Sequence, residues 1–192
     1  MNIIADAQIQ HHRLTVEAYH RMGEAGILGE DASVELIEGG LIDRTPIGSR
    51  HAGTVSALND AFAVALHGRA IVAVQSPVTL AEHSEPQPDL AILKFRRDYY
   101  RAAHPGPGDV HLLIEVADTS ATYDRDIKVP LYARHGIPEV WLVDLAKMRL
   151  EAYHGPEGGE YRHVDYYRSG TVSPKAFADL KLALEALGFP PS

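Results

Sequence analysis

The stretch His111-Leu112-Leu113-Ile114-Glu115-Val116-Ala117 is an apolar run of strand length with a single carboxylate inside it. Consecutive aliphatic side chains predict a β-strand that is covered on both faces, where an ionised carboxylate without a partner is costly. Upstream, Asp89 stands at the start of a second apolar run, Leu90 to Leu93. Two neighbouring strands would then each offer a carboxylate, and one divalent cation would satisfy both charges. The sequence therefore predicts a metal site built on Asp89 and Glu115.

The composition limits the class of protein. With 192 residues and 45% hydrophobic content the chain can bury one sizeable core, and we expect a single domain over residues 1–192 with a flexible N-terminus at residues 1–12. The absence of cysteine excludes disulfides and cysteine-built metal sites, and it fits a reducing cytoplasm. With no export signal or membrane-length apolar run, we expect a soluble cytoplasmic protein that enters no membrane. A formal charge of -8 disfavours broad attraction to nucleic acid, so any such contact must be local.

Hydrophobic periodicity and turn residues predict the order of the elements. A helix at residues 14–22, capped by Thr15, precedes a hairpin of residues 34–38 and 41–43 that turns on Gly39-Gly40. An amphipathic helix at residues 51–68 should cover the sheet. An exposed excursion is expected from Lys94 to Gly108, and two further helices at residues 130–135 and 176–187. Besides the strand around Glu115, strands are expected at residues 70–74, 77–80, 89–93, 140–143, 150–153 and 161–167.

Paired carboxylates suit magnesium, which prefers oxygen ligands and keeps several waters, one of which can be activated to attack a phosphodiester. A nearby lysine would complete such a site. Glu115 and position 117 share a strand face, but position 117 is alanine. Lys128 is the substitute, because it follows a turn, lies near the start of a predicted helix, and could reach over the small Ala117.

Four motifs occur in a recognisable order, and they are Glu35 to Gly39, Gln87 to Leu90, Ile114 to Val116 and Asp124 to Lys128. Together with Leu131 to Arg134 and Gly136 to Asp144, they make the chain resemble the Uma-two family of "putative endonucleases" from Leu14 to about Tyr167. This resemblance implies a branch of the PD-(D/E)XK nuclease superfamily. The implied fold is of the α/β class, a restriction-endonuclease-like mixed central sheet flanked by helices. The implied cofactor is magnesium, for which manganese substitutes, and the catalytic lysine has moved from strand to helix.

The resemblance also implies roles for individual residues. Asp89 and Glu115 would be metal ligands, with the backbone carbonyl of Val116 as a further one. Lys128 would orient the water or stabilise charge, and Glu35 would be the auxiliary acid. Relatives often carry another acid where Gly40 stands. The auxiliary acid here is therefore Glu35, with Glu38 as the alternative candidate. Glu35 and Glu38 point to opposite strand faces, so at most one of them should enter the site. The implied function is a magnesium-dependent endonuclease that cuts DNA.

Simpler interpretations stay open beside these roles. Asp89 could be a strand-end acid that accepts backbone hydrogen bonds, and Glu115 could form only a structural salt bridge with Lys128. His51 opens the second predicted helix and suits either a capping or a substrate-side role. The eleven histidines contain no zinc-binding spacing and are expected at scattered surface and core positions.

The basic and aromatic excursion has two interpretations as well. Its cations could touch a nucleic-acid backbone beside the site, or they could belong to an ordinary solvated loop. They are Lys94, Arg96, Arg97 and Arg101. At the level of the whole chain, the alternative to an endonuclease is a non-catalytic module that binds nucleic acid or protein and carries a vestigial site. Divalent-metal binding would separate these two classes, and a homo-oligomer is compatible with either.

Overall fold

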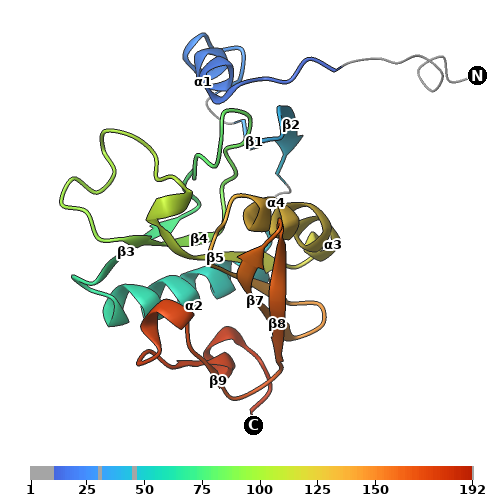
Figure 1. The fold of residues 1–192 in the computed structure, drawn as a ribbon. Coiled ribbons are helices and arrows are strands. Elements are labelled where there is room, and N and C mark those ends of the chain that lie inside the picture. Colours follow the sequence, from blue (N-terminus) through green and yellow to red (C-terminus); the bar gives the residue numbers. More distant parts are fainter. Residues whose placement is uncertain (1–10, 30–31, 45–46, 192) are drawn as a thin grey trace, which may run out of the picture.

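A six-stranded mixed sheet forms the centre of the molecule (Figure 1). The structure is a computed structural model and describes residues 11–29, 32–44 and 47–191. Strands β5 and β6 pair in parallel, and every other neighbouring pair in this sheet is antiparallel. In spatial order the strands are β3 (Ala70–Val74), β4 (Leu90–Lys94), β5 (Val110–Ala117), β6 (Glu139–Asp144), β7 (Arg149–Glu157) and β8 (Glu160–Tyr167).

Strand β5 is buried on both faces, as its apolar sequence predicts. Side chains alternate between the two faces of a strand. Leu112, Ile114 and Val116 belong to the core under helix α2 (Ser49–Ala65). Leu113 and Ala117 belong to the opposite core, which helix α4 (Val129–Arg134) covers. Glu115 therefore points to the α4 face, the face it shares with Ala117.

The connection between the parallel strands β5 and β6 is a continuous helical run. It comprises α3 (Ala121–Tyr123), a π-helical segment (Asp124–Lys128) and α4. The predicted helix at residues 130–135 is thus too short. In the π-helical segment the Val129 amide donates to the Asp124 carbonyl, five residues back. Pro130 has no amide hydrogen to donate to the preceding turn. We infer that the wider π-helical turn before Pro130 is what lets the helical run continue through it.

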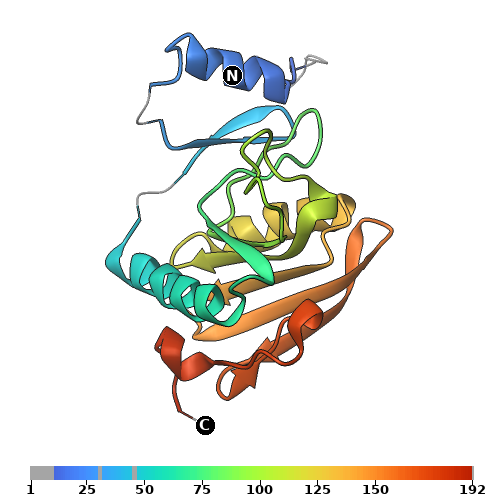
Figure 2. The same ribbon diagram turned by 90° about the vertical axis from the view of Figure 1, so that its left-hand side faces the viewer.

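Helix α1 and a two-stranded hairpin form a separate layer at one end of the molecule, and the C-terminus lies at the other end (Figures 1 and 2). Thr15 caps α1 (Val16–Glu24), as predicted, by accepting a hydrogen bond from the Ala18 amide. The hairpin consists of β1 (Val34–Ile37) and β2 (Gly40–Asp43).

The hairpin turn is displaced by one residue from the prediction. Its two central residues are Glu38 and Gly39, with φ of 50° and 86°, while Gly40 pairs with Ile37 inside the ladder. A Cβ at Gly39 would lie 2.6 Å from Arg13 Cβ, so close packing as well as backbone conformation requires glycine there. Gly39, which packs against Arg13, therefore takes the second central position of the turn.

Two predicted elements are wrong. Residues 77–80 form a loop instead of a strand, although Val78 and Leu80 are buried in the α4-side core. Residues 176–187 form no α-helix, because Leu180, Leu182 and Leu184 alternate with the period of a strand and all three are buried. This end of the chain consists of two short strands and two 3₁₀ turns, β9 (Thr171–Val172), Lys175–Phe177, β10 (Leu182–Ala183) and Leu184–Leu187. Another 3₁₀ turn, Pro107–Asp109, precedes β5.

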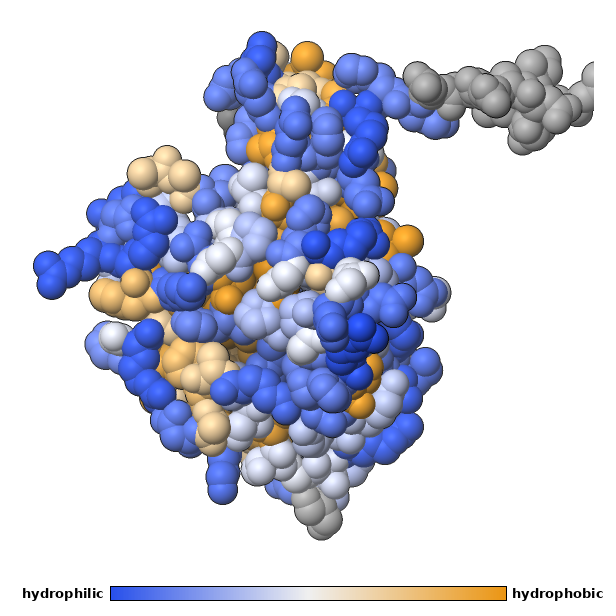
Figure 3. Space-filling model, in the orientation of Figure 1, coloured by the Kyte–Doolittle hydropathy of each residue, from blue (hydrophilic) through white to orange (hydrophobic). Residues whose placement is uncertain are grey.

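On the face of the molecule shown in Figure 3, hydrophilic residues cover most of the surface and hydrophobic residues form separate patches. Within the described residues, no helix is both long enough and apolar enough to cross a membrane. The flexible N-terminus expected over residues 1–12 lies, apart from His11 and His12, outside the described residues.

Candidate active site

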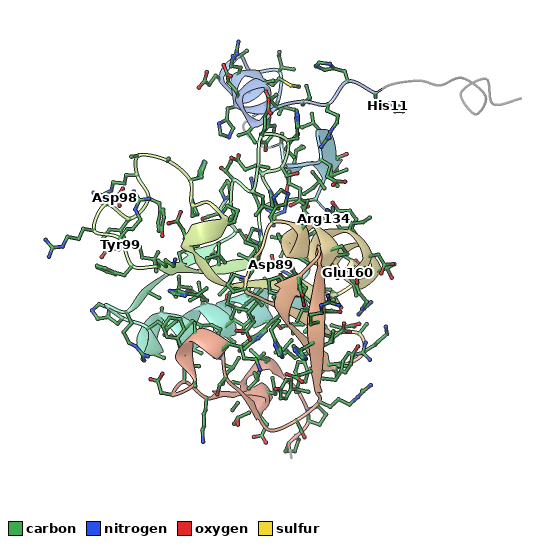
Figure 4. All side chains as sticks on the ribbon, viewed as in Figure 1. His11, Asp89, Asp98, Tyr99, Arg134 and Glu160 are labelled. Atoms are coloured by element: carbon green, nitrogen blue, oxygen red, sulfur yellow. The ribbon has the colours of Figure 1, made fainter. Side chains whose placement is uncertain are left out.

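The register of β4 and β5 brings the two predicted metal-binding acids together. Leu90 pairs with Ile114 in the antiparallel ladder, so Asp89, one residue earlier, lies beside Glu115, one residue later. The two residues retain only 5% and 3% of their accessible surface. Both line a cleft of about 550 Å³, and Figure 4 shows Asp89 in the middle of the molecule. The cleft is also lined by Glu35, Ile42, Asp43, Arg44, Ile47, Gly48, His51, Val116, Asp118, Thr119, Ser120, Tyr123, Asp124 and Lys128.

Lys128 lies between two buried carboxylates. Its Nζ is 3.2 Å from Glu115 Oε1 and 3.1 Å from Glu35 Oε2. Tyr132, one turn further along the same helical run, donates its hydroxyl hydrogen to Glu115 Oε1 at 2.5 Å. The Gln87 amide donates to Glu35 Oε2 at 3.1 Å. The helical run thus places a cation over the strand face of Glu115, where Ala117 leaves space.

Burial and neighbouring charges change the acidity of this pair. Burial, together with the nearby acids Asp124, Asp89 and Glu35, raises the pKa of Glu115 to about 8 despite the attraction of Lys128. Burial alone would lower the pKa of Lys128, but the carboxylates of Glu115, Glu35 and Asp124 raise it above its usual value. Lys128 is therefore a cation at neutral pH. With a pKa of about 8, Glu115 is largely protonated at pH 7, and a divalent cation bound in the cleft would displace this proton and take the carboxylate as an anionic ligand.

Asp89 is held in one orientation by three groups. The Val116 amide donates to its Oδ2 at 2.9 Å, His51 Nε2 lies 3.0 Å from the same oxygen, and Gln75 Nε2 donates to Oδ1 at 3.3 Å. Burial raises the pKa of Asp89, but the hydrogen bonds with His51 and Val116 outweigh it and lower the pKa below its usual value. The same hydrogen bond has the opposite effect on its other partner, because it raises the pKa of His51. His51 therefore faces the site from α2 and does not cap that helix, whose N-cap is Gly48.

Two buried polar atoms at the cleft lack partners within the described residues. They are His51 Nδ1 and the hydroxyl of Tyr123. Buried polar atoms are nearly always hydrogen-bonded, so such orphans indicate a missing water, ion or ligand group. The site also offers oxygen donors from Asp89 and Glu115, the kind that magnesium prefers. The residues present thus fit a hydrated divalent cation.

Residues 16–185 match the model of the Uma2 (Uma-two) family, which is described as "Putative restriction endonuclease". The chain belongs to the Uma2 family. A crystal structure described as "a putative nuclease belonging to DUF820 from Anabaena variabilis ATCC 29413" superposes with a TM-score of 0.71 at 17% identity, covering 91% of this chain and 97% of that chain. This likeness shows a shared fold. Among curated proteins, no sequence matches the chain. The predicted family and the mixed sheet flanked by helices are confirmed, and Uma2 membership supports a nuclease function.

Three residues that reach the cleft of this Uma2 family member received no individual role from the sequence. Asp124 is 5% exposed, and Ser120 donates its hydroxyl hydrogen to Asp124 Oδ2 at 2.6 Å. Burial raises the pKa of Tyr123 to about 12. Arg44 Nη2 lies 3.9 Å from Asp89 Oδ1. Asp124 lies in one of the segments on which the family resemblance rests, and this signal could have predicted a place for it in the site. Arg44 and Tyr123 have no sequence signal beyond their residue types.

Of the two alternative auxiliary acids, only Glu35 enters the site. Glu38 lies in the exposed hairpin turn, where Arg134 donates to it at 2.9 Å. Glu35 and Glu38 point to opposite faces of the hairpin strand in the sequence-based prediction, which allows at most one of them into the site, and the structure has this arrangement. Glu38 is therefore not positioned to replace Glu35 as a neighbour of Lys128.

The structure does not bring the cationic excursion to the site. The excursion follows the far end of β4, and Figure 4 shows Asp98 and Tyr99 well away from Asp89. The four cations therefore lie at or beyond the end of β4 opposite to Asp89, and their contact with a nucleic-acid backbone stays a prediction. Arg96 pairs with Asp98 at 2.7 Å and stacks over the Tyr100 ring. The four cations are Lys94, Arg96, Arg97 and Arg101.

The π-helical segment that carries Lys128 is anchored to the sheet by Arg125. Arg125 Nη2 donates to Glu151 Oε1 at 2.7 Å and to Asp144 Oδ2 at 3.1 Å. Arg149 and Tyr153 also donate to Glu151. Burial raises the pKa of Glu151, but these hydrogen bonds outweigh it and lower the pKa to about 2. Glu151 is only 1% exposed, so its ionised form is a structural part of the sheet beside the site.

We predict that Glu151 makes the fold sensitive to acid. Because its folded pKa lies below its unfolded value of 4.5, its contribution to stability is present above pH 4.5 and is lost as the pH falls towards 2. A shift of this size corresponds to on the order of 3 kcal/mol. Glu151→Gln should therefore lower the free energy of unfolding by about that amount at pH 7 and by less than half of it at pH 3, measured by urea denaturation. Glu157→Gln, at an exposed salt bridge with Arg162, is the matched control. An equal loss at both pH values in Glu151→Gln would contradict the prediction.

Proposed function

We propose that this chain is a metal-dependent endonuclease that hydrolyses DNA phosphodiester bonds with magnesium-activated water. One observation carries the proposal. Two buried carboxylates, Asp89 just before β4 and Glu115 in the adjacent β5, line one cleft, and Lys128 Nζ lies 3.2 Å from Glu115 Oε1. Uma2 membership supports the same reaction class. A purely structural ion pair between Glu115 and Lys128 would need neither the neighbouring Asp89 nor the cleft.

The residues that would hold the cation are Asp89 and Glu115, through side-chain oxygens, and Val116, through its carbonyl. Magnesium, or manganese in its place, would lower the pKa of a coordinated water and offset charge on the scissile phosphate. The hydrogen bonds to Asp89 from Val116 and Gln75 orient that carboxylate before any ion binds.

Lys128 would position the attacking water and stabilise the developing negative charge. An ammonium group has three hydrogens, and two of the Lys128 partners within the described residues are Glu35 and Glu115. The third hydrogen is available to a water or a phosphate oxygen in the cleft. Glu35, fixed by the Gln87 amide, would act by holding Lys128 in place. Such preorganised donors stabilise charge without reorganising during the reaction.

The acidic chain would approach DNA through local contacts. Arg44 lines the cleft close to Asp89, and the unpartnered atoms of His51 and Tyr123 would gain partners from phosphate oxygens or their waters. With a formal charge of -8, the protein needs the bound cation to bring a phosphate next to Glu35, Glu115 and Asp124.

The test is cleavage of supercoiled plasmid, linear duplex DNA and RNA by the purified chain, in magnesium and in EDTA. We expect nicked and linear plasmid in magnesium or manganese, none in EDTA, and none from Asp89→Asn protein, which controls for contaminating nucleases. Cleavage of RNA alone would refute the DNA substrate, and cleavage in EDTA would refute metal dependence. DNA binding without any cleavage would identify a non-catalytic binding module.

A further inference from the structure

A second group of potential metal ligands lies outside the candidate active site. His20 from α1, Glu85 from the loop before β4 and His104 from the excursion each offer a ligand atom, and these atoms all lie within 4.8 Å of one another. No other set of three or more His, Asp or Glu residues in the described part of the chain meets that condition. We propose that these three residues form a zinc-type divalent metal site that ties α1 to the excursion.

Glu85 is the buried centre of this group. It is only 1% exposed, and its carboxylate contacts His20 Nε2 at 2.6 Å and accepts the Thr79 hydroxyl hydrogen at 2.6 Å. Among the described residues, no lysine or arginine forms an ion pair with Glu85. A buried carboxylate needs compensation by a cation or by several hydrogen bonds. A divalent cation between Glu85 and the two imidazoles would supply that charge.

Thr79 connects the two loops that carry ligands. Its hydroxyl orients Glu85, and its backbone amide donates to the Pro105 carbonyl at 3.0 Å, next to His104. Thr79 therefore orients the carboxylate and holds the backbone next to His104 before any ion binds. Hydrogen bonds of this kind, which orient a ligand from outside the coordination sphere, accompany functional metal sites.

Small side-chain movements would complete the geometry. Zinc bonds of about 2.0 to 2.1 Å in a tetrahedral arrangement place ligand atoms roughly 3.3 Å apart. His20 Nε2 and Glu85 Oε1, now 2.6 Å apart, would separate slightly, while the most distant pair, within 4.8 Å, would approach. The two imidazoles have room to move, because the side chain of His20 is 43% exposed and His104 lies at the surface.

The donor set differs from that of the candidate active site. Two imidazoles and one carboxylate favour zinc, cobalt or nickel over magnesium, which prefers an all-oxygen shell. The three residues line a hollow of about 540 Å³, which shares no lining residue with the cleft at Asp89. A fourth coordination position would open into this hollow. The histidine site is thus chemically and spatially separate from Asp89 and Glu115.

The site would stabilise the attachment of α1. This helix buries none of its residues and lies at the end of the molecule (Figure 2). Besides the His20–Glu85 contact, its attachments include the hydrogen bond from the Tyr19 hydroxyl to the Val34 carbonyl at 2.9 Å. Elements with so little burial open locally at low cost in free energy. Metal bonds from α1 to the loop before β4 and to the excursion should reduce that opening.

Calorimetric titration of the full chain with Zn²⁺ tests the site, in Asp89→Asn protein so that the candidate active site contributes little. We expect one equivalent to bind, and His20→Ala and His104→Ala each to weaken binding by on the order of a hundredfold or more. His67→Ala, at an exposed histidine, is the matched control. Titration with Co²⁺ should give visible absorption bands that Zn²⁺ abolishes. Absent binding, or binding that survives both substitutions, would overturn the site.

Limited trypsin digestion tests the attachment of α1. Arg21 lies in α1 and is exposed, so its cleavage reports local opening of the helix. Zn²⁺ should slow this cleavage in Asp89→Asn protein and should have no effect in Asp89→Asn/His104→Ala protein. Cleavage after Arg21 that proceeds equally with and without bound Zn²⁺ would overturn the proposal that the metal holds α1.

Discussion

Lys128→Ala should lower the single-turnover rate of DNA cleavage by on the order of a hundred- to a thousandfold, because it removes a positioned charge from a buried site. Metal binding should persist, since Lys128 is not a proposed ligand and Asp89 and Glu115 remain. The substitution leaves Glu35 and Glu115 without the cation that lies 3.1 and 3.2 Å from them. Circular dichroism with and without manganese would establish that the variant is folded. Lys181→Ala, at an exposed lysine, is the matched control. Wild-type rates in Lys128→Ala would remove Lys128 from the mechanism.

A second change tests whether Lys128 occupies the place of a strand lysine. Ala117 is fully buried on the strand face that Glu115 shares. Adding Ala117→Lys to Lys128→Ala would return an ammonium group to Glu115 from the strand, and part of the lost rate should return. Adding Ala117→Leu instead fills the same space without a charge and should give no recovery. Recovery with leucine as well would show that packing, and not charge, limits the Lys128→Ala protein.

Asp89→Asn and Glu115→Gln should each lower cleavage by at least as much as Lys128→Ala, because each removes a charge that would hold the cation. Both substitutions keep the size of the side chain and most of its hydrogen bonds. Raising the manganese concentration should recover part of the rate in these two variants, where metal affinity is the defect. It should not recover the rate in Lys128→Ala. Equal metal rescue of all three variants would contradict the separate roles.

Local patterns in the sequence predict the sheet and the carboxylate pair well. Strand β5 is a continuous apolar run, and the antiparallel pairing brings Asp89, just before β4, next to Glu115, near the end of β5. Lys128 could be assigned because alternation put Ala117 on the face of Glu115 and because the family resemblance marked the segment from Asp124 to Lys128. Each of these inferences depends on residues close together in the chain or on neighbouring strands.

The remaining errors come from interactions between distant segments. Residues 176–187 have a spacing that suits a helix as well as a strand, and packing against the α2-side core selects short strands and turns. The hairpin turn shifts because Gly39 packs against Arg13. His20, Glu85 and His104 meet only through tertiary structure, so no local spacing predicts their cluster. Composition also says nothing of the direction in which β4 runs, so the position of the excursion relative to Asp89 could not be predicted from it.

Calorimetric titration of the metal-free protein with Mn²⁺ tests the pairing of Asp89 and Glu115 most directly. The titration is made in His104→Ala protein, so that the proposed histidine site contributes little. One ion per chain should bind, and both Asp89→Ala and Glu115→Ala should weaken that binding, while Lys128→Ala should leave it. Unchanged manganese affinity in both carboxylate variants would contradict a metal site at Asp89 and Glu115.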